Sequence, residues 1–315
     1  MTVRTRVGSV RNRVVLALVL AVCVGIPVGV WAQERRAAPA APPNVKVLRD
    51  LEYAQAPVTT AAGQKKLLID LYLPTDLEGP MPVVVWIHGG AWQNGSKDNP
   101  PATGMTRRGY AVASISYRFA QEAVFPAQIE DCKAAMRWLR AHAKEYNLDP
   151  DRIGVWGASA GGHLVALLGT SGDVKELEGD EGNAEYSSRV QAVCDFCGPT
   201  DFLQFEPNQV SVAYRQATSM LVGGRVLDHK EKATQANPIT WITKDDPPFL
   251  IVHGDQDRVV PYQQSELLAA ALEKAGVPVT LQIVKDGPHG GMTPETIRMV
   301  NEFFDANLKP AKKAQ

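Results

Sequence analysis

Ser159 is the residue whose neighbours most clearly favour nucleophilic chemistry. It lies in Gly157-Ala158-Ser159-Ala160-Gly161, a Gly-x-Ser-x-Gly pattern between an apolar stretch at 153–156 and a helix-like stretch at 160–168. On a sharp turn from strand to helix, side chains two residues before and two residues after the serine would clash, and glycine removes them. The serine hydroxyl then stands clear of the sheet, where it can attack a carbonyl carbon.

Backbone N–H groups near Ser159 are expected to form an oxyanion hole. The N–H of Ala160 would lie at the positive end of the following helix. A second donor is expected from Gly89 or Gly90, which follow the apolar run Val83–Ile87, and an ordinary Gly-Gly turn is the alternative. In related chemistry, one such donor contributes about 3 kcal/mol to stabilising the oxyanion. We expect the neighbouring His88 to orient this loop rather than to act in catalysis.

Two further loops carry a candidate base and a candidate carboxylate. His289 lies in a Gly-Pro-His-Gly-Gly run after the last apolar stretch, where glycines give it room to reach Ser159. It would take the serine proton and return it to the leaving group. Asp255 and Asp257 both follow an earlier apolar stretch. We prefer Asp257 as the partner of His289, because Asp255 directly follows a glycine and suits a turn.

These side chains need a fold that brings their loops together. Strands are predicted at 45–53, 66–73, 83–87, 110–117, 153–156, 190–196, 249–253 and 279–284, and helices at 126–146, 160–168, 263–275 and 293–308. Alternation of this kind predicts an α/β fold, with a mainly parallel central sheet and helices on both faces. Ligands gather at the carboxyl ends of such strands, so the three loops are expected to converge there.

The length and composition of the chain suit one α/β domain, which we place at 45–310, followed by a short tail at 311–315. The chain has 315 residues, of which 45% are hydrophobic and 21% are charged. Within this domain, residues 202–246 are expected to form a modest, partly helical insertion, or partial cap, before the Asp-bearing strand. Residues 171–188 are polar and are expected to form a solvated loop.

Charge and cysteine usage exclude several classes of function. The formal net charge of −1 gives no reason to expect a nucleic-acid partner or an anionic membrane surface. Cys132, Cys194 and Cys197 remain after the N-terminal segment, and an odd number does not describe a disulfide framework. Cys194 and Cys197 have redox-motif spacing, but we expect them to be buried small residues. No ligand pattern is spaced for zinc, so neither a metal nor another cofactor is expected.

The first 32 residues are typical of a signal peptide. Four arginines precede the uncharged apolar run 14–30, and cleavage is expected after Ala32. An uncleaved anchor is the alternative, because a run of about 17 residues is at the lower limit for a membrane span. Residues 33–44 are rich in alanine and proline and are expected to be a flexible linker. Cleavage would make the protein secreted or periplasmic, without a membrane anchor.

Taken with these motifs, the sequence resembles the α/β-hydrolase superfamily over nearly all of residues 45–308. It is most similar to the carboxylesterase branch that includes hormone-sensitive-lipase-like esterases and bifunctional feruloyl/acetyl-xylan esterases. The matching features are His88-Gly89-Gly90-Ala91-Trp92, Tyr117-Arg118, Phe125-Pro126, Asp131, Arg137-Trp138-Leu139, the Ser159 motif, and the chain order Ser159, Asp257, His289. The resemblance implies a serine carboxylesterase for short acyl esters. With secretion, it suggests acetyl or feruloyl groups on plant polysaccharide as substrate.

Trp92 marks a departure from the lipase-like members, which usually have His-Gly-Gly-Gly. We expect Trp92 either to line the acyl pocket as a substrate-binding residue or to pack under the loop. The His-Gly-Gly-x-Trp pattern also resembles kynurenine formamidases, so an arylformamidase-like amide hydrolase is an alternative. A catalytically inactive binding protein with a hydrolase fold is a further alternative, which the presence of all three candidate residues disfavours.

Overall fold

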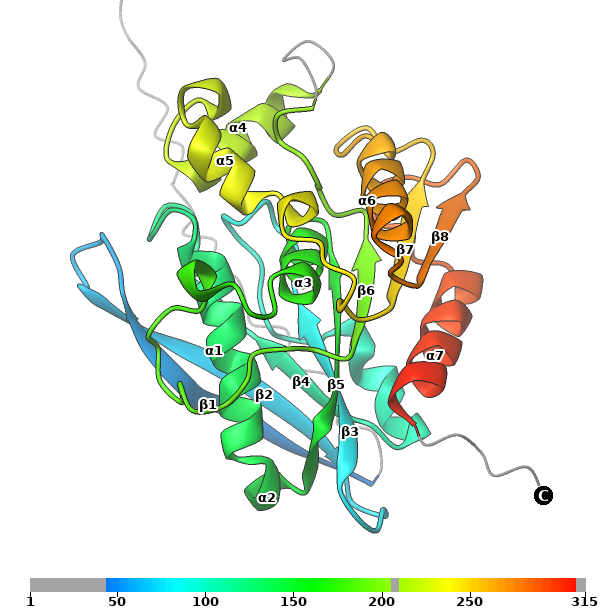
Figure 1. Cartoon of the computed structure of the whole chain (residues 1–315). Coiled ribbons are helices and arrows are strands. Elements are labelled where there is room, and N and C mark those ends of the chain that lie inside the picture. Colours follow the sequence, from blue (N-terminus) through cyan, green and yellow to red (C-terminus); the bar gives the residue numbers. More distant parts are fainter. Residues whose placement is uncertain (1–43, 205–209, 310–315) are drawn as a thin grey trace, which may run out of the picture. The chain divides into compact units, whose positions relative to one another are not determined.

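A computed structural model describes residues 44–204 and 210–309, all of which belong to one compact unit that spans Ala38–Gln315 (Figure 1). The signal peptide expected over 1–32, nearly all of the linker expected over 33–44, and the tail at 311–315 lie outside the described residues. Those expectations stay predictions. Within the described ranges, no helix is both long enough and apolar enough to cross a membrane.

Eight strands form one sheet in the order β1-β2-β4-β3-β5-β6-β7-β8. They are β1 (Val45–Pro57), β2 (Gln64–Pro74), β3 (Met81–Ile87), β4 (Ala111–Ile115), β5 (Leu148–Ala158), β6 (Ala192–Phe196), β7 (Phe249–Gly254) and β8 (Val279–Val284). The β1–β2 and β2–β4 pairs are antiparallel, and every other pair is parallel. The predicted mainly parallel sheet is therefore confirmed.

Helices cover both faces of the sheet, as expected. They are α1 (Ala127–Ala141), α2 (Ala143–Tyr146), α3 (Ala160–Thr170), α4 (Val212–Val222), α5 (Lys230–Ala236), α6 (Gln263–Ala275) and α7 (Pro294–Leu308). All seven residues of β3 are buried, and their side chains alternate between two cores. Val85 packs in the core that contains Leu164 of α3, whereas Val84 packs in the core that contains Phe304 of α7. A strand covered on both faces explains the uninterrupted apolar run.

Two element boundaries differ from the sequence prediction. The helix predicted over 126–146 is divided into α1 and α2 at His142, whose ring nitrogen Nδ1 lies 2.9 Å from the Trp138 carbonyl oxygen. The ring thus competes for a carbonyl that the backbone N–H of His142 also uses. In addition, β5 begins at Leu148 rather than at 153, because Leu148 pairs with Met81 across a register shift.

The acidic loop at 171–188 is anchored rather than simply solvated. Glu178 accepts hydrogen bonds from the side chains of Lys133 and Arg137, both of which are buried on α1. The Glu181 side chain is only 3% exposed and pairs with Arg118. The solvated loop is confirmed for most of this segment but not for these two acids, because the buried cations that balance them lie 41 to 63 residues earlier in the chain.

Residues 202–246, expected to form an insertion, contain α4, α5 and the short 3-10 helices Val226–Asp228 and Pro238–Thr240. In Figure 1, α4 and α5 lie at the end of the sheet to which the arrows of β6 and β7 point. Two contacts fix the insertion to this end. The Phe202 ring packs edge-on against Trp92, and the Leu221 carbonyl accepts from the N–H of Phe125.

Candidate functional site

Ser159 occupies the turn between β5 and α3 with φ 57° and ψ −121°. A positive φ is uncommon for a residue with a side chain, so the surrounding structure must hold it there. A Cβ on Gly157 would lie 2.3 Å from the Gly161 carbonyl oxygen, and one on Gly161 would lie 2.0 Å from the Ile87 carbonyl oxygen. Both contacts are with backbone atoms, so the turn requires glycine at both positions.

Backbone bonds hold this turn on both sides. The N–H of Ser159 donates to the carbonyl of Phe196 at the end of β6, over 2.8 Å. The carbonyl of Ser159 accepts from the N–H of His163 over 3.0 Å, inside the first turn of α3. Ala160 is the first residue of α3, so its N–H has no acceptor within the helix. It therefore lies at the positive end of the helix dipole, next to the serine.

Asp257 and His289 come from the loops after β7 and β8, and they meet. His289 Nδ1 lies 2.6 Å from Asp257 Oδ2. The N–H groups of Val259 and Val260 donate to the other carboxylate oxygen, over 2.7 and 3.0 Å. The Asp257 side chain is 0% exposed, whereas 28% of the His289 side chain is exposed. Asp257 can thus fix the ring of His289 while the ring still reaches solvent.

The pKa of Asp257 is lowered well below the usual range of an aspartate. Burial alone would raise this pKa, but hydrogen bonds from His253, His289, Val259 and Val260 lower it by more. The carboxylate is therefore ionised at neutral pH and accepts the Nδ1–H of His289. A negative charge at this place stabilises the cationic form of the His289 ring.

His253 is a partner of Asp257 that sequence reasoning missed. It lies at the end of β7 and is fully buried. Its Nε2 also lies 3.0 Å from Asp257 Oδ2, and its Nδ1 lies 2.7 Å from the Ser265 hydroxyl. The spacing of four residues between His253 and Asp257 is the only signal in the sequence. The competing Asp255 instead follows β7 with its N–H bonded to the Val284 carbonyl.

Cys197 lies between the Ser159 turn and the His289 loop. Its sulfur and the ligand atoms of Asp257 and His289 all lie within 4.8 Å of one another. Burial, and then the charge of Asp257, raise the pKa of the Cys197 thiol, while the nearby backbone N–H groups of Ser159 and Gly290 lower it. The buried sulfur therefore lies among the segments that carry Ser159, Asp257 and His289.

The cysteines of the described residues are buried and unpaired, as predicted from the sequence. Cys132, Cys194 and Cys197 are all free and buried. Within the described ranges, Cys197, Asp257 and His289 are also the one group of three side chains close enough to hold a metal ion. Asp257 and His289 already bond to each other there.

Gly89 and Gly90 lie against the Ser159 turn. A Cβ on Gly89 would lie 3.3 Å from the Cβ of Ser159 and 2.7 Å from the Ala158 carbonyl oxygen. Gly90 has φ 117°, a conformation that favours glycine. In the described part of the chain, turn and loop backbone bonds do not use the N–H groups of Gly89, Gly90 or Ala160. These groups are therefore left to bind a ligand or water.

Trp92 packs under the glycine loop and is only 2% exposed. Its indole N–H donates to His163 Nδ1 over 3.2 Å, and the Nε2 of His163 donates to the Ala236 carbonyl over 2.7 Å. The ring also contacts Phe202 edge-on. Of the two roles expected for Trp92, the structure favours packing under the loop over lining an open acyl pocket.

A cavity of about 340 Å³ lies in the insertion, between α4 and the Val226–Asp228 helix. Its lining residues are Asp201, Phe202, Val210, Val212, Tyr214, Arg215, Gln216, Thr218, Ser219, Arg225, Val226 and Leu227. Because Phe202 contacts both Trp92 and His163, this cavity adjoins the loops of the candidate site. No motif in the sequence predicts this cavity.

Comparison with known proteins places the chain in a family. The BD-FAE family model matches residues 69–272. The probable carboxylic ester hydrolase LipM of Mycobacterium tuberculosis is 36% identical over 194 residues, which are 60% of this chain and 44% of LipM. The chain spans about half the length of the curated relatives it matches.

Two solved structures are also similar. A truncated carbohydrate esterase from gut microbiota is 32% identical with a TM-score of 0.75, covering 83% of this chain and 95% of that one. An acetyl ester-xyloside bifunctional hydrolase from Caldicellulosiruptor lactoaceticus is 27% identical with a TM-score of 0.66, covering 77% and 88%. The α/β-hydrolase fold expected from the sequence is thereby confirmed. Since the matched residues 69–272 are more than half of the chain, this protein belongs to the BD-FAE family.

Proposed function

We propose that this chain is a serine carboxylesterase that hydrolyses short acyl esters through an acyl-enzyme. The main support is the 2.6 Å hydrogen bond between Asp257 and His289, beside the strained turn of Ser159. Cys197 supports the proposal further, because its sulfur lies within 4.8 Å of the Asp257 and His289 ligand atoms, and the residue before it, Phe196, accepts from the N–H of Ser159. The similarity to a carboxylic ester hydrolase and to a carbohydrate esterase agrees with this chemistry.

The proposed reaction has two halves. Ser159 Oγ attacks the carbonyl carbon of the ester while His289 Nε2 takes the hydroxyl proton. Asp257 holds the ring through Nδ1 and stabilises its positive charge. The proton then passes to the departing alkoxide, so an alcohol leaves and the acyl group stays on Ser159. In the second half, water attacks the acyl carbon while His289 takes its proton; the proton then passes to Ser159 Oγ as the bond to the acyl carbon breaks, so the carboxylic acid leaves and Ser159 is restored.

The oxyanion of each tetrahedral intermediate would be held by the N–H of Ala160 and by that of Gly89 or Gly90. All three N–H groups are left unused by the turn and loop backbone bonds of the described residues, which supports this role. Gly89 lies against the Ser159 turn, since a Cβ on it would be 3.3 Å from the Cβ of Ser159, which also supports this role. Each donor in such a site contributes about 3 kcal/mol to transition-state stabilisation.

Acetyl or feruloyl groups on plant polysaccharide are the substrates that we propose. Two similar solved proteins are described as a carbohydrate esterase and as an acetyl ester-xyloside bifunctional hydrolase, which supports a carbohydrate ester. The signal peptide that we propose for residues 1–32 would place the enzyme in the periplasm or outside the cell. There it would meet such polysaccharides.

A substrate panel tests this function. Acetylated xylan, methyl ferulate, p-nitrophenyl acetate and N-formylkynurenine are each incubated with the wild type and with Ser159→Ala. We expect the esters to be hydrolysed by the wild type and at least about 10³-fold more slowly by the variant. If N-formylkynurenine is turned over faster than every ester, amide hydrolysis replaces the proposal. Equal rates with both proteins would remove Ser159 from the mechanism.

A further inference from the structure

The loop 88–93, which contains Gly89 and Gly90, is held on both sides of the glycines by the segment 117–121. Before the glycines, the Tyr117 hydroxyl donates to the His88 carbonyl over 3.0 Å. After them, the N–H of Ala120 donates to the Trp92 carbonyl over 2.7 Å, and the Gln121 amide donates to the Gln93 carbonyl over 2.8 Å. The position of the glycine loop therefore depends on that of the segment 117–121.

The bond from Tyr117 acts on a particular peptide plane. The carbonyl of His88 and the N–H of Gly89 belong to the same planar trans peptide unit, so they point in opposite directions and turn together. A donor fixed on the His88 oxygen thus sets the direction of the Gly89 N–H. His88 Nδ1 lies 2.8 Å from the Gly89 carbonyl oxygen and sets the next plane, which carries the Gly90 N–H, in the same way.

Tyr117 and His88 also support each other. Their rings stack with centroids 4.5 Å apart and planes 17° from parallel. Tyr117 is fully buried, and burial raises the pKa of its hydroxyl well above the usual value, so the hydroxyl stays a donor. Burial likewise lowers the pKa of His88, even though its bond to the Gly89 carbonyl raises that pKa, so the ring stays neutral.

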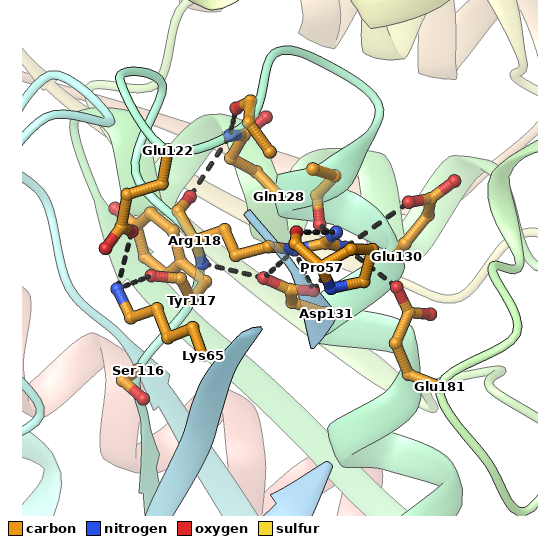
Figure 2. A network of polar contacts seen from close by, with 12 residues as sticks. Pro57, Lys65, Ser116, Tyr117, Arg118, Glu122, Gln128, Glu130, Asp131 and Glu181 are labelled. Atoms are coloured by element: carbon orange, nitrogen blue, oxygen red, sulfur yellow. Dashed lines mark hydrogen bonds and ion pairs between the residues drawn. The ribbon is translucent and has the colours of Figure 1, made fainter. Parts of the chain in front are cut away.

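A buried polar network fixes the segment 117–121 in turn (Figure 2). Asp131 of α1, which is 0% exposed, accepts from the backbone N–H of Arg118 over 2.6 Å and from its Nε over 2.9 Å. Gln128 donates to the Arg118 carbonyl over 3.1 Å. On the other side, Glu122 accepts from the N–H of Phe119 over 2.7 Å and from Lys65 over 2.6 Å.

Such a network is better suited to fixing geometry than to adding stability. Removing two charges from water costs about as much as their attraction returns, so a buried ion pair such as Arg118–Asp131 adds little net stability. The bonds of Asp131 and Gln128 instead hold the backbone N–H and the carbonyl of Arg118, the residue next to Tyr117. The network thereby determines where the Tyr117 ring and hydroxyl lie.

We propose that Tyr117 is a positioning residue for the oxyanion hole, which orients the Gly89 N–H through the His88 carbonyl and is itself held by the Arg118–Asp131 pair. The inference rests on the proposed esterase function and goes further, because it assigns a role to a residue that contacts no reacting atom. It also selects Gly89 as an oxyanion donor whose direction is fixed by another side chain.

The test is Tyr117→Phe, which keeps the ring and its stack on His88 but removes the hydroxyl. A misdirected oxyanion donor weakens transition-state binding more than substrate binding. We expect kcat for p-nitrophenyl acetate to fall about fivefold to tenfold, as for the loss of one hydrogen bond, with KM unchanged. The Ki of a trifluoromethyl ketone, whose adduct with the serine carries an oxyanion, should rise by the same factor.

Tyr110→Phe is the control. Tyr110 is also buried, and its hydroxyl donates to Asp305 Oδ1 of α7 over 2.9 Å, away from the segment 117–121 and the loop 88–93. Both variants lose one tyrosine hydrogen bond, so both thermal midpoints should fall, while only Tyr117→Phe should lower kcat and weaken inhibitor binding.

The outcomes separate this inference from the proposed function. Unchanged kcat and Ki in Tyr117→Phe, or equal losses of kcat in both variants, would overturn the positioning role. A wild type that the ketone does not inhibit, or a Ser159→Ala variant that retains activity, would instead remove the proposed function itself.

Discussion

At the scale of single residues, Asp257 is the centre of the candidate site, because its carboxylate accepts hydrogen bonds from two histidine rings and two backbone N–H groups. Sequence reasoning could choose Asp257 over Asp255 from the preceding glycine, and it could single out His289 from its glycine-rich loop. It could not find His253 or Cys197 as neighbours of that pair. Cys197 follows β6, so its proximity to Asp257 appears only when β6 and β7 are placed side by side, and the bond of His253 to Asp257 depends on how the loop after β7 turns back.

Asp257→Asn is the substitution that probes this residue. One carboxylate oxygen becomes an NH₂ donor, and in either orientation of the amide this donor faces other donors, either the two ring N–H groups or the N–H groups of Val259 and Val260. His289 is then held in the wrong tautomer or orientation, and we expect kcat for p-nitrophenyl acetate to fall by about 10³-fold or more.

Asp255→Asn is the control for this measurement, because Asp255 lies two residues away and makes no bond to His289 within the described ranges. Its kcat should stay within about twofold of the wild type, since no bond of the proposed mechanism is changed. A large loss in Asp255→Asn with little loss in Asp257→Asn would reverse the assignment.

At the scale of elements, the sequence pattern was most informative where a strand or helix is set by its own residues. The helix at 263–275 and the strand at 279–284 have the predicted bounds. The division of the helix at His142 and the early start of β5 were missed, because a ring–carbonyl bond and a register shift against β3 decide them. The Gly-x-Ser-x-Gly turn was predictable, because its residues are contiguous in the sequence, although the space at Gly161 is limited by Ile87 of β3.

Gly161→Ala tests that steric requirement. The added Cβ would lie 2.0 Å from the Ile87 carbonyl oxygen, so either β3 or the Ser159 turn must move. We expect the free energy of unfolding, measured by urea titration, to fall by about 3 kcal/mol or more.

Gly104→Ala provides the comparison, because a Cβ at Gly104 meets nothing within 4 Å. Its free energy of unfolding should change by less than about 1 kcal/mol. Similar stability losses in the two variants would show that the close approach of Gly161 to β3 is not what holds the turn.

At the scale of the whole molecule, the sheet brings loops that are far apart in sequence to one edge. Parallel strands with adjacent carboxyl ends made it possible to predict that Ser159, Asp257 and His289 lie near one another. The strand order and the fold of residues 202–246 were not predictable. The insertion has mixed patterning, and its position is decided by contacts such as Phe202 with Trp92 and Ala236 with His163.

His163 of α3 is hydrogen-bonded both to Trp92 of the glycine loop and to Ala236 of the insertion. Because it is buried, we expect it to make the stability of the protein depend on pH. Burial lowers the pKa of His163 to about 4, although its bond to the Ala236 carbonyl raises that pKa. In the unfolded chain the pKa of a histidine is about 6.5, so at a pH between the folded and the unfolded pKa the unfolded state binds more protons than the folded state. This contribution to stability is complete above pH ~6.5 and is lost as the pH falls towards 4, by about 3 kcal/mol.

Urea titrations of the wild type and of His163→Gln at several pH values between about 7 and 4.5 measure this contribution. The variant should be less stable at neutral pH, because glutamine does not reproduce the packing of the ring against Trp92 and Phe202, but its stability should fall less steeply as the pH is lowered. The same slope in both proteins would mean that other groups cause the acid sensitivity.

Labelling by a fluorophosphonate probe tests the central claim most directly, because only an activated serine reacts with it. We expect one label per chain, mapped by peptide mass spectrometry to Ser159, with slower labelling in Asp257→Asn and none in Ser159→Ala. A wild-type protein that stays unlabelled, or that carries the label on a different serine, would contradict the proposed role of Ser159.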